Sequence, residues 1–208
     1  MEILRVIIID DEPRSGIVKD YVRAFQDGEI CIGPTDSLKN GYKGFLDAGN
    51  NVFNDADEAA YYLGEELVRL SREWHSVHGI IIDTMMPLKP EGVLLNSYHV
   101  DKNTAGFGLV VHLHTKMLEY NKGENRTERR FNMPICFVTQ LPVIETLDPL
   151  KAMLDIREIP CFRTKDELWL PESGISVMHT WKQDLADRLP EFTRELKEWI
   201  TKSRKRKT

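Results

Sequence analysis

The sequence has few cysteines and no long run of apolar residues. Its 208 residues include three cysteines, Cys31, Cys136 and Cys161, and no two of them form a CxxC pair. Each lies in or beside an apolar run, which predicts reduced core cysteines and argues against disulfides and zinc sites. No apolar window reaches the length of a membrane span, and the first apolar run meets acids by Asp10, unlike a signal peptide. We therefore expect a cytoplasmic protein that has no membrane partner.

An excess of charge of one sign is also missing. The formal net charge is −5 at pH 7, and 41% of the residues are hydrophobic. A small negative charge does not predict nucleic-acid binding, and the basic run from Lys202 to Lys207 is typical of a solvated chain end. The length and the hydrophobic fraction predict one domain with a sizeable core.

The most distinctive features of the sequence are two apolar segments that end in carboxylates. Residues 80–82 are three isoleucines, a β-branched run that predicts a strand buried on both faces. Asp83 ends this strand, and a second strand at 6–9 ends in the same way at Asp10 and Asp11. In each case a proline follows within a few residues and prevents the strand from continuing. In open α/β sheets, ligands bind at the carboxyl ends of the strands.

Apolar strands alternate with helical periodicity along the chain. Further short strands are expected at 30–32, 134–138 and 159–162. The alternation predicts an α/β fold, in which a doubly wound, five-stranded parallel sheet is flanked by helices.

The expected domain organisation has one main part and one extension. We expect an α/β domain at 1–168, interrupted by insertions at about 35–54 and 88–105. Residues 169–208 are expected to form a linker and a helical C-terminal extension with a basic tail, in which Pro190 begins a helix.

Right-handed crossovers place the carboxyl ends of all these strands on one edge of the sheet. This edge is expected to carry three acids, a threonine and a lysine: Asp10, Asp11, Asp83, Thr139 and Lys165. Three carboxylates at one point predict a site for Mg²⁺, which prefers hard oxygen ligands. Lysine and threonine suit an incoming phosphoryl group, and Asp83 is the candidate nucleophile for an aspartyl phosphate.

In these features the chain resembles the receiver domains of two-component response regulators. The resemblance rests on the paired acids Asp10-Asp11, on the segment from Asp83 to Pro87, on Thr139, and on Phe162 three residues before Lys165. It extends roughly from Ile3 to Lys165, apart from the two insertions.

The resemblance implies a flavodoxin-like fold with sheet order 2-1-3-4-5. It implies that a histidine kinase or a phosphotransfer protein phosphorylates Asp83. Mg²⁺ would be held by Asp11, Asp83 and the backbone carbonyl of Met85, with Asp10 assisting through water. Thr139 and the ring of Phe162 would form the coupled switch that reports phosphorylation.

Several residues depart from the receiver pattern. Gln140 stands where a small residue usually leaves room for the phosphoryl group, and Asp166 replaces the proline that usually follows the lysine. Met85 and Leu141 occupy the positions that tune dephosphorylation, and both are apolar. Neither can orient an attacking water, so we expect slow loss of phosphate.

Three functions are compatible with this pattern. The favoured function is a phosphorylatable receiver, which phosphorylates itself from a donor and is not otherwise an enzyme. The chain after Lys165 leaves no room for a DNA-binding output domain. We therefore expect the receiver to act on a downstream protein. Its C-terminal helices would be available for docking or for forming a homodimer. The alternatives are a receiver-like interaction module that takes no phosphate, and a Mg²⁺-dependent phosphohydrolase of the haloacid-dehalogenase type. That class needs a second acid two residues after the nucleophile, where this chain has Met85.

The histidines do not form a metal-ligand pattern. His75, His78, His99, His112 and His114 lack partner acids at helix-compatible spacing, so we expect ordinary structural or surface roles.

Overall fold

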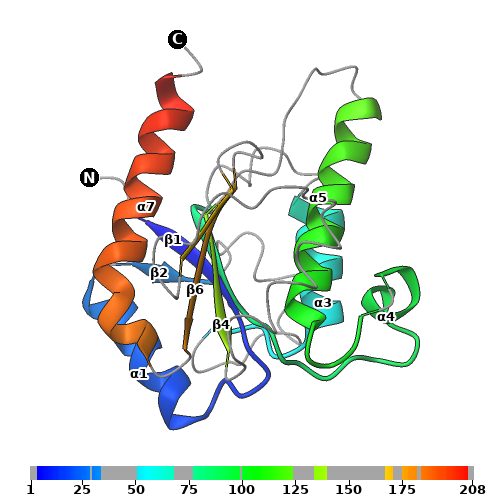
Figure 1. The fold of residues 1–208 in the computed structure, drawn as a ribbon, viewed down its shortest axis with the longest axis horizontal. Helices are drawn as coiled ribbons and strands as arrows, with labels where there is room; N and C mark the ends of the chain where they lie inside the picture. The colour runs from blue at the N-terminus through cyan, green and yellow to red at the C-terminus, as the bar shows by residue number, and fades with distance from the viewer. Residues whose placement is uncertain are drawn as a thin grey trace.

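The chain folds into three layers, with a parallel sheet between two groups of helices (Figure 1). The structure is a computed structural model that describes residues 4–28, 30–33, 51–67, 77–98, 100–123, 134–139, 167–170, 175–181 and 184–205. No helix in these ranges is long and apolar enough to cross a membrane.

Four neighbouring strands of the sheet are parallel to one another. Their order across the sheet is β2 (Cys31–Ile32), β1 (Arg5–Ile9), β3 (Gly79–Asp83) and β4 (Ile135–Thr139). These are the first four strands expected from the sequence, so the predicted α/β fold with a parallel sheet is confirmed. The central three contain mostly β-branched and aromatic residues, which pack well in a sheet covered on both faces.

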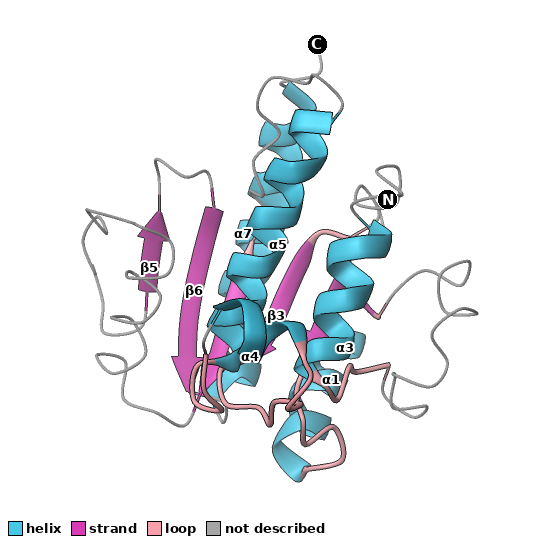
Figure 2. Cartoon of the chain, turned by 90° about the vertical axis from the view of Figure 1, so that its right-hand side faces the viewer, coloured by secondary structure: helices cyan, strands magenta, loops and turns pink. Residues whose placement is uncertain are grey.

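A hairpin extends the sheet beyond β4. Strand β6 (Ile175–Trp181) pairs in parallel with β4, and β5 (Glu167–Leu170) pairs antiparallel with β6 at the edge (Figure 2). The sequence analysis expected a linker from residue 169, and this was wrong, because β6 pairs along its whole length with β4 or β5. The strand expected at 159–162 lies outside the described residues.

Helices cover both faces of the sheet. Helices α1 (Gly16–Asp27) and α7 (Leu185–Lys205) lie on one side in Figure 1, and the other helices lie on the opposite side. Those others are α3 (Ala56–Tyr61) with its π-helical continuation η1 (Tyr62–Leu67), α4 (Val93–Tyr98) and α5 (Ala105–Gly123).

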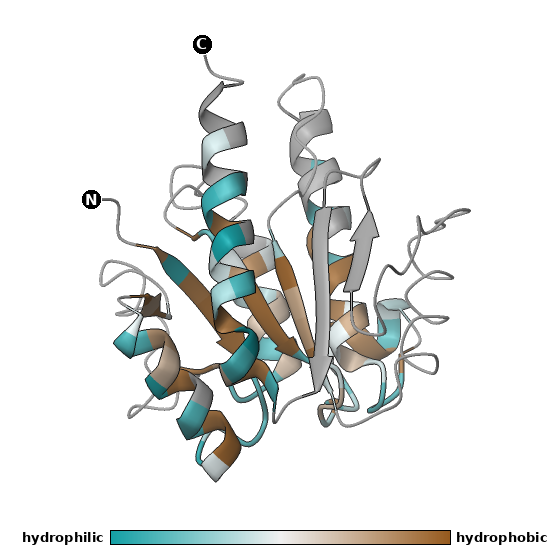
Figure 3. Cartoon of the chain, turned by 60° about the vertical axis from the view of Figure 1, so that its left-hand side comes forward, coloured by the Kyte–Doolittle hydropathy of each residue, from teal (hydrophilic) through white to brown (hydrophobic). Residues whose placement is uncertain are grey.

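Alternate residues of each strand supply two separate cores. In β1, Ile7 and Ile9 belong to the cluster under α3 and α5, whereas Val6 and Ile8 belong to the cluster under α1 and α7. The central strands are apolar along their length (Figure 3). This period of two is the geometry of a strand that is buried on both faces.

Helix α7 packs against its own domain. Leu185, Leu189, Phe192 and Leu196 are buried, and the Phe192 ring meets the Phe25 ring of α1 edge to face at 6.3 Å. The helix begins five residues before Pro190, not at it as expected, so Pro190 lies inside the helix. The apolar face of α7 up to Leu196 therefore serves the core of this chain.

The two cysteines in the described ranges are reduced, as expected. Cys136 is fully buried, and this burial raises the pKa of its thiol. Cys31 is partly exposed, and Cys161 lies outside the described residues.

The first insertion returns to the sheet before it ends. Phe53 pairs with β1, since its N–H donates to the Ile8 carbonyl at 2.9 Å and its carbonyl accepts from Asp10 N at 2.8 Å. Gly33 and Asn51 bound the excursion, and both have positive φ, +87° and 58°. A Cβ on Gly33 would lie 2.8 Å from the Cβ of Asn51, so the close approach of the two ends requires glycine at 33.

The second insertion is fastened to α3 by a buried carboxylate. Asp55 caps α3 by accepting from Glu58 N at 2.9 Å. Asp57 is only 8% exposed and accepts from the backbone N–H groups of Lys89 at 3.2 Å and Leu94 at 3.0 Å. It thereby holds the start of α4 in place.

We predict that Asp57→Ala lowers the free energy of unfolding by about 3 kcal/mol, because the buried N–H of Leu94 and the partly buried N–H of Lys89 lose a charged acceptor. Asp55→Ala is the matched control on the same helix, and it should cost about 1 kcal/mol for the lost cap. Urea denaturation of both variants measures the difference. An Asp57→Ala loss no larger than that of Asp55→Ala would contradict the fastening role.

Candidate active site at the carboxyl edge of the sheet

Three carboxylates meet where β1 and β3 end. The two strands are neighbours with Ile9 opposite Ile82, so Asp10 and Asp83 come next in the same register. One oxygen each from Asp10, Asp11 and Asp83 lie within 4.8 Å of one another. The approach of these three side chains, expected from the sequence, is present in the structure.

The two inner carboxylates are buried and are held in the same way. Asp10 is 0% exposed and Asp83 is 5% exposed. Asp10 Oδ1 accepts from Glu12 N at 2.9 Å, and Asp83 Oδ1 accepts from Met85 N at 2.9 Å. In both turns an aspartate accepts from the backbone two residues later, which directs the chain away from the sheet.

The donor set fits a small hard cation. Carboxylate oxygens are the ligands that Mg²⁺ prefers, and ligand oxygens around an octahedral Mg²⁺ lie about 3.0 Å apart when adjacent and about 4.2 Å apart when opposite. One carboxylate oxygen from each of the three aspartates already lies within 4.8 Å of the other two, so small side-chain movements would bring these oxygens to the spacing of Mg²⁺ ligands. Asp10, Asp11 and Asp83 are therefore the residues that could hold a divalent ion.

Two buried threonines lie beside the acids. Thr139 ends β4, as expected, and its Oγ1 accepts a hydrogen bond from Thr84 Oγ1 at 2.7 Å. Both side chains are 0% exposed. The sequence analysis missed Thr84, although the signal was available: β3 and β4 are neighbours, so residues just beyond their ends must meet.

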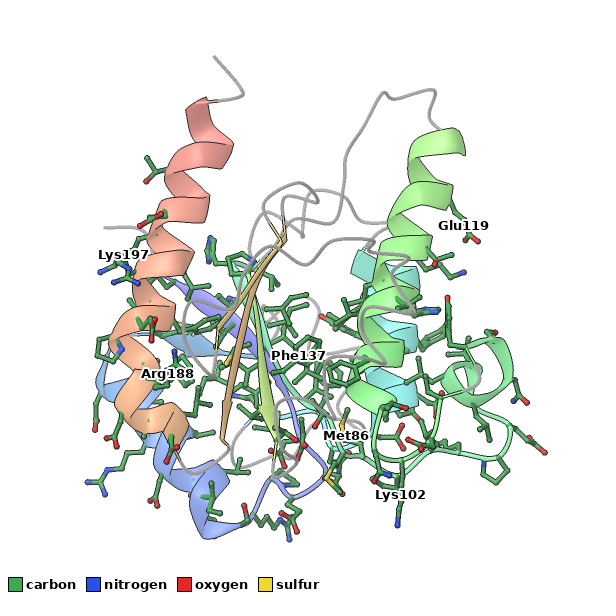
Figure 4. All side chains as sticks on the ribbon, viewed as in Figure 1. Met86, Lys102, Glu119, Phe137, Arg188 and Lys197 are labelled. Carbon is green, nitrogen blue, oxygen red and sulfur yellow. The ribbon has the colours of Figure 1, made fainter. Side chains whose placement is uncertain are left out.

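Helix α5 begins directly against the loop that follows Asp83. Gly106 N donates to the Thr84 carbonyl at 3.2 Å, and Met86 N donates to the Lys102 carbonyl at 2.9 Å. Figure 4 labels Met86 and Lys102 in this part of the molecule. A Cβ on Gly106 would overlap the Asp83 carbonyl oxygen and the backbone of Thr84. Only glycine allows this approach, and no sequence pattern indicated it.

The remaining predicted site residues lie outside the described ranges: Phe162, Lys165 and the departures Gln140, Leu141 and Asp166. The site as described therefore consists of the acids, the backbone of Met85 and the two threonines.

The buried histidines have structural contacts. His78 Nδ1 accepts from Arg5 N at 3.0 Å, and His112 Nδ1 lies 3.2 Å from the Tyr98 hydroxyl. Burial raises the pKa of Tyr98. His75 and His99 lie outside the described residues.

Sequence comparisons do not add to this picture. No protein-family model matches the chain, and no curated protein sequence matches it. A functional assignment therefore depends on the geometry of the strand ends.

We predict that Gly106→Ala lowers the free energy of unfolding by about 1–3 kcal/mol, because the new methyl group forces α5 away from Asp83 and Thr84. Gly16→Ala is the control, since a Cβ there meets nothing within 4 Å. In helices alanine is favoured over glycine, so the control should be neutral or stabilising. Denaturant unfolding of both variants tests this, and equal stabilities would show that α5 does not need the glycine.

Proposed function

We propose that the chain is a receiver-type signalling domain that accepts a phosphoryl group on Asp83 in a Mg²⁺-dependent reaction. The observation that carries this proposal is the set of three carboxylates within 4.8 Å at the carboxyl ends of adjacent parallel strands. A buried threonine ends the next strand along. An acid cluster with a neighbouring hydroxyl is suited to binding a cation and a phosphoryl group together.

The arrangement of the sheet supports the same proposal. A receiver has the strand order 2-1-3-4-5, and the first four positions correspond to β2-β1-β3-β4. We assign the fifth position to β6, because it pairs in parallel with β4 and leads into α7. Helix α7 then packs against α1, so that both helices cover one face of the sheet.

In this proposal Mg²⁺ is held by Asp11, Asp83 and the backbone carbonyl of Met85, with Asp10 acting through water. The ion would neutralise the oxygens of the incoming phosphoryl group and the repulsion among the carboxylates.

The residues of the chain divide the chemical work. An oxygen of Asp83 attacks the phosphorus of a donor, forming a new P–O bond while the bond from phosphorus to the donor nitrogen or oxygen breaks. The donor leaves with that electron pair. The Thr139 hydroxyl donates a hydrogen bond to a phosphoryl oxygen, and the burial of Asp83 limits access of water. With Met85 and Leu141 unable to orient a water, the aspartyl phosphate is long-lived.

The register of β6 adds a second candidate for the phosphate-binding lysine. Lys165 is the candidate from sequence spacing, with Phe162 as the switch residue. However, Trp181 ends β6 opposite Thr139, and the next residue in the sequence is Lys182. His179 stands three residues before Lys182, at the same spacing as Phe162 before Lys165. Lys182 and His179 therefore compete with Lys165 and Phe162 for these roles.

The proposed partners follow from the chemistry. A histidine kinase or a phosphotransfer protein would supply the phosphoryl group in the cytoplasm, and a downstream protein would read the result. The Met86–Lys102 hydrogen bond joins the loop after Asp83 to the second insertion, which Asp57 fastens to α3. This insertion is a direct route from the site to the surface formed by α3 and α4.

We predict that the intact protein gains one phosphoryl group when it is incubated with Mg²⁺ and acetyl phosphate, and that Asp83→Ala gains none. Intact-mass spectrometry measures the adduct. Asp27→Ala, which removes an exposed acid at the C-terminal end of α1, is the matched control and should be phosphorylated normally. No adduct on the wild-type chain, together with no binding of beryllofluoride, would favour an interaction module, whereas consumption of the donor without an adduct would favour a phosphohydrolase.

The same assay separates the two lysines. Lys182→Met should slow phosphorylation at least tenfold if β6 is the fifth receiver strand, while Lys165→Met should then leave the rate nearly unchanged. The reverse result would restore the assignment from sequence spacing.

A further inference from the structure

The Thr84 side chain has no role in the reaction as proposed, yet it is fully buried beside the residue that contacts the phosphoryl group. Its hydroxyl donates to Thr139 Oγ1 at 2.7 Å. Thr84 also directly follows the nucleophile Asp83 in the chain. We propose that Thr84 is a positioning residue that holds the Thr139 hydroxyl in the orientation needed to bind the phosphoryl group. This inference rests on the proposed function.

Thr84 is itself held firmly enough to orient a neighbour. Its N–H donates to the Val138 carbonyl at 3.0 Å, which continues the pairing of β3 with β4. Its carbonyl accepts from Gly106 N at 3.2 Å at the start of α5. The backbone of Thr84 is therefore bonded on both sides, and its side chain extends from a fixed point.

The hydrogen bond also sets the direction in which Thr139 can donate. A threonine hydroxyl has one hydrogen and two lone pairs. Since a hydroxyl can accept and donate at the same time, Thr139 can keep the hydrogen bond to Thr84 while it donates its own hydrogen to a phosphoryl oxygen. The bond also favours one side-chain rotamer of Thr139, a β-branched residue with few rotamers.

This role is separable from cation binding. Among the described residues the cation would be held by the carboxylates of Asp10, Asp11 and Asp83, whereas the Thr84 hydroxyl is engaged with Thr139. Loss of the Thr84 hydroxyl should therefore weaken the interaction with the phosphoryl group without weakening the interaction with Mg²⁺. A threonine that only supported the fold would not produce this split.

The test compares Thr84→Val and Thr84→Ser in the full chain. Valine keeps the shape and removes the donor, whereas serine keeps the donor. Calorimetry measures the affinity for Mg²⁺ and, in saturating Mg²⁺, for beryllofluoride, an analogue of the aspartyl phosphoryl group. We expect Thr84→Val to bind beryllofluoride about 3- to 10-fold more weakly, the effect of one hydrogen bond. Thr84→Ser should match the wild type, and Mg²⁺ affinity should be unchanged in both.

A double-mutant cycle adds a second criterion. If Thr84 acts through Thr139, Thr84→Val should weaken binding no further in a chain that already carries Thr139→Val. If Thr84→Val is unfolded, Thr84→Ala removes the same hydroxyl without adding volume and replaces it in the cycle.

The outcomes separate the two proposals. If the wild type binds beryllofluoride, three results would each overturn the positioning role alone. Thr84→Val binds beryllofluoride with the same affinity as the wild type, Thr84→Val binds it more tightly, or Thr84→Ser binds it as weakly as Thr84→Val. A wild-type chain that binds Mg²⁺ but no beryllofluoride would overturn the proposed function, and the role of Thr84 with it.

Discussion

The mutual repulsion of three carboxylates is the constraint on which the rest of the site depends. Two unit charges 4.8 Å apart repel by about 3 kcal/mol at an effective dielectric constant of about 20. The chain accepts this cost because strand pairing determines where Asp10 and Asp83 emerge, and the pairing is stabilised by apolar residues on both faces of the sheet. Stability from the core therefore maintains an arrangement that favours a bound cation.

Next to the acids, specific contacts join the loop after Asp83 to α5 and to the second insertion. Gly106 lets α5 approach the backbone of Thr84, and the Met86–Lys102 hydrogen bond joins the loop to the insertion. Asp57 then connects the insertion to α3. A continuous set of hydrogen bonds, made by the backbone and by the Asp57 carboxylate, therefore links the loop after Asp83 to a surface formed by α3 and α4.

Much of this could be predicted from the sequence because strands with period-two burial and terminal acids are local patterns. The first four strands and the meeting of Asp10, Asp11 and Asp83 follow from such patterns. The hairpin of β5 and β6 was mistaken for a linker, since short strands next to a glycine lack a distinctive period. The Gly106 contact and the two hydrogen bonds of Asp57 were beyond reach, because they join residues whose proximity only the folded chain creates.

The most direct test of this account is the thermal stability of the wild type and of Asp83→Asn with and without Mg²⁺ at neutral pH. If the three carboxylates form a cation site, Mg²⁺ raises the Tm of the wild type, since a ligand that binds only the folded state stabilises it. Asp83→Asn should have a higher Tm than the wild type in the absence of Mg²⁺, because one repelling charge is gone, and should respond little to the ion. A wild type indifferent to Mg²⁺ and a destabilised Asp83→Asn would contradict the account.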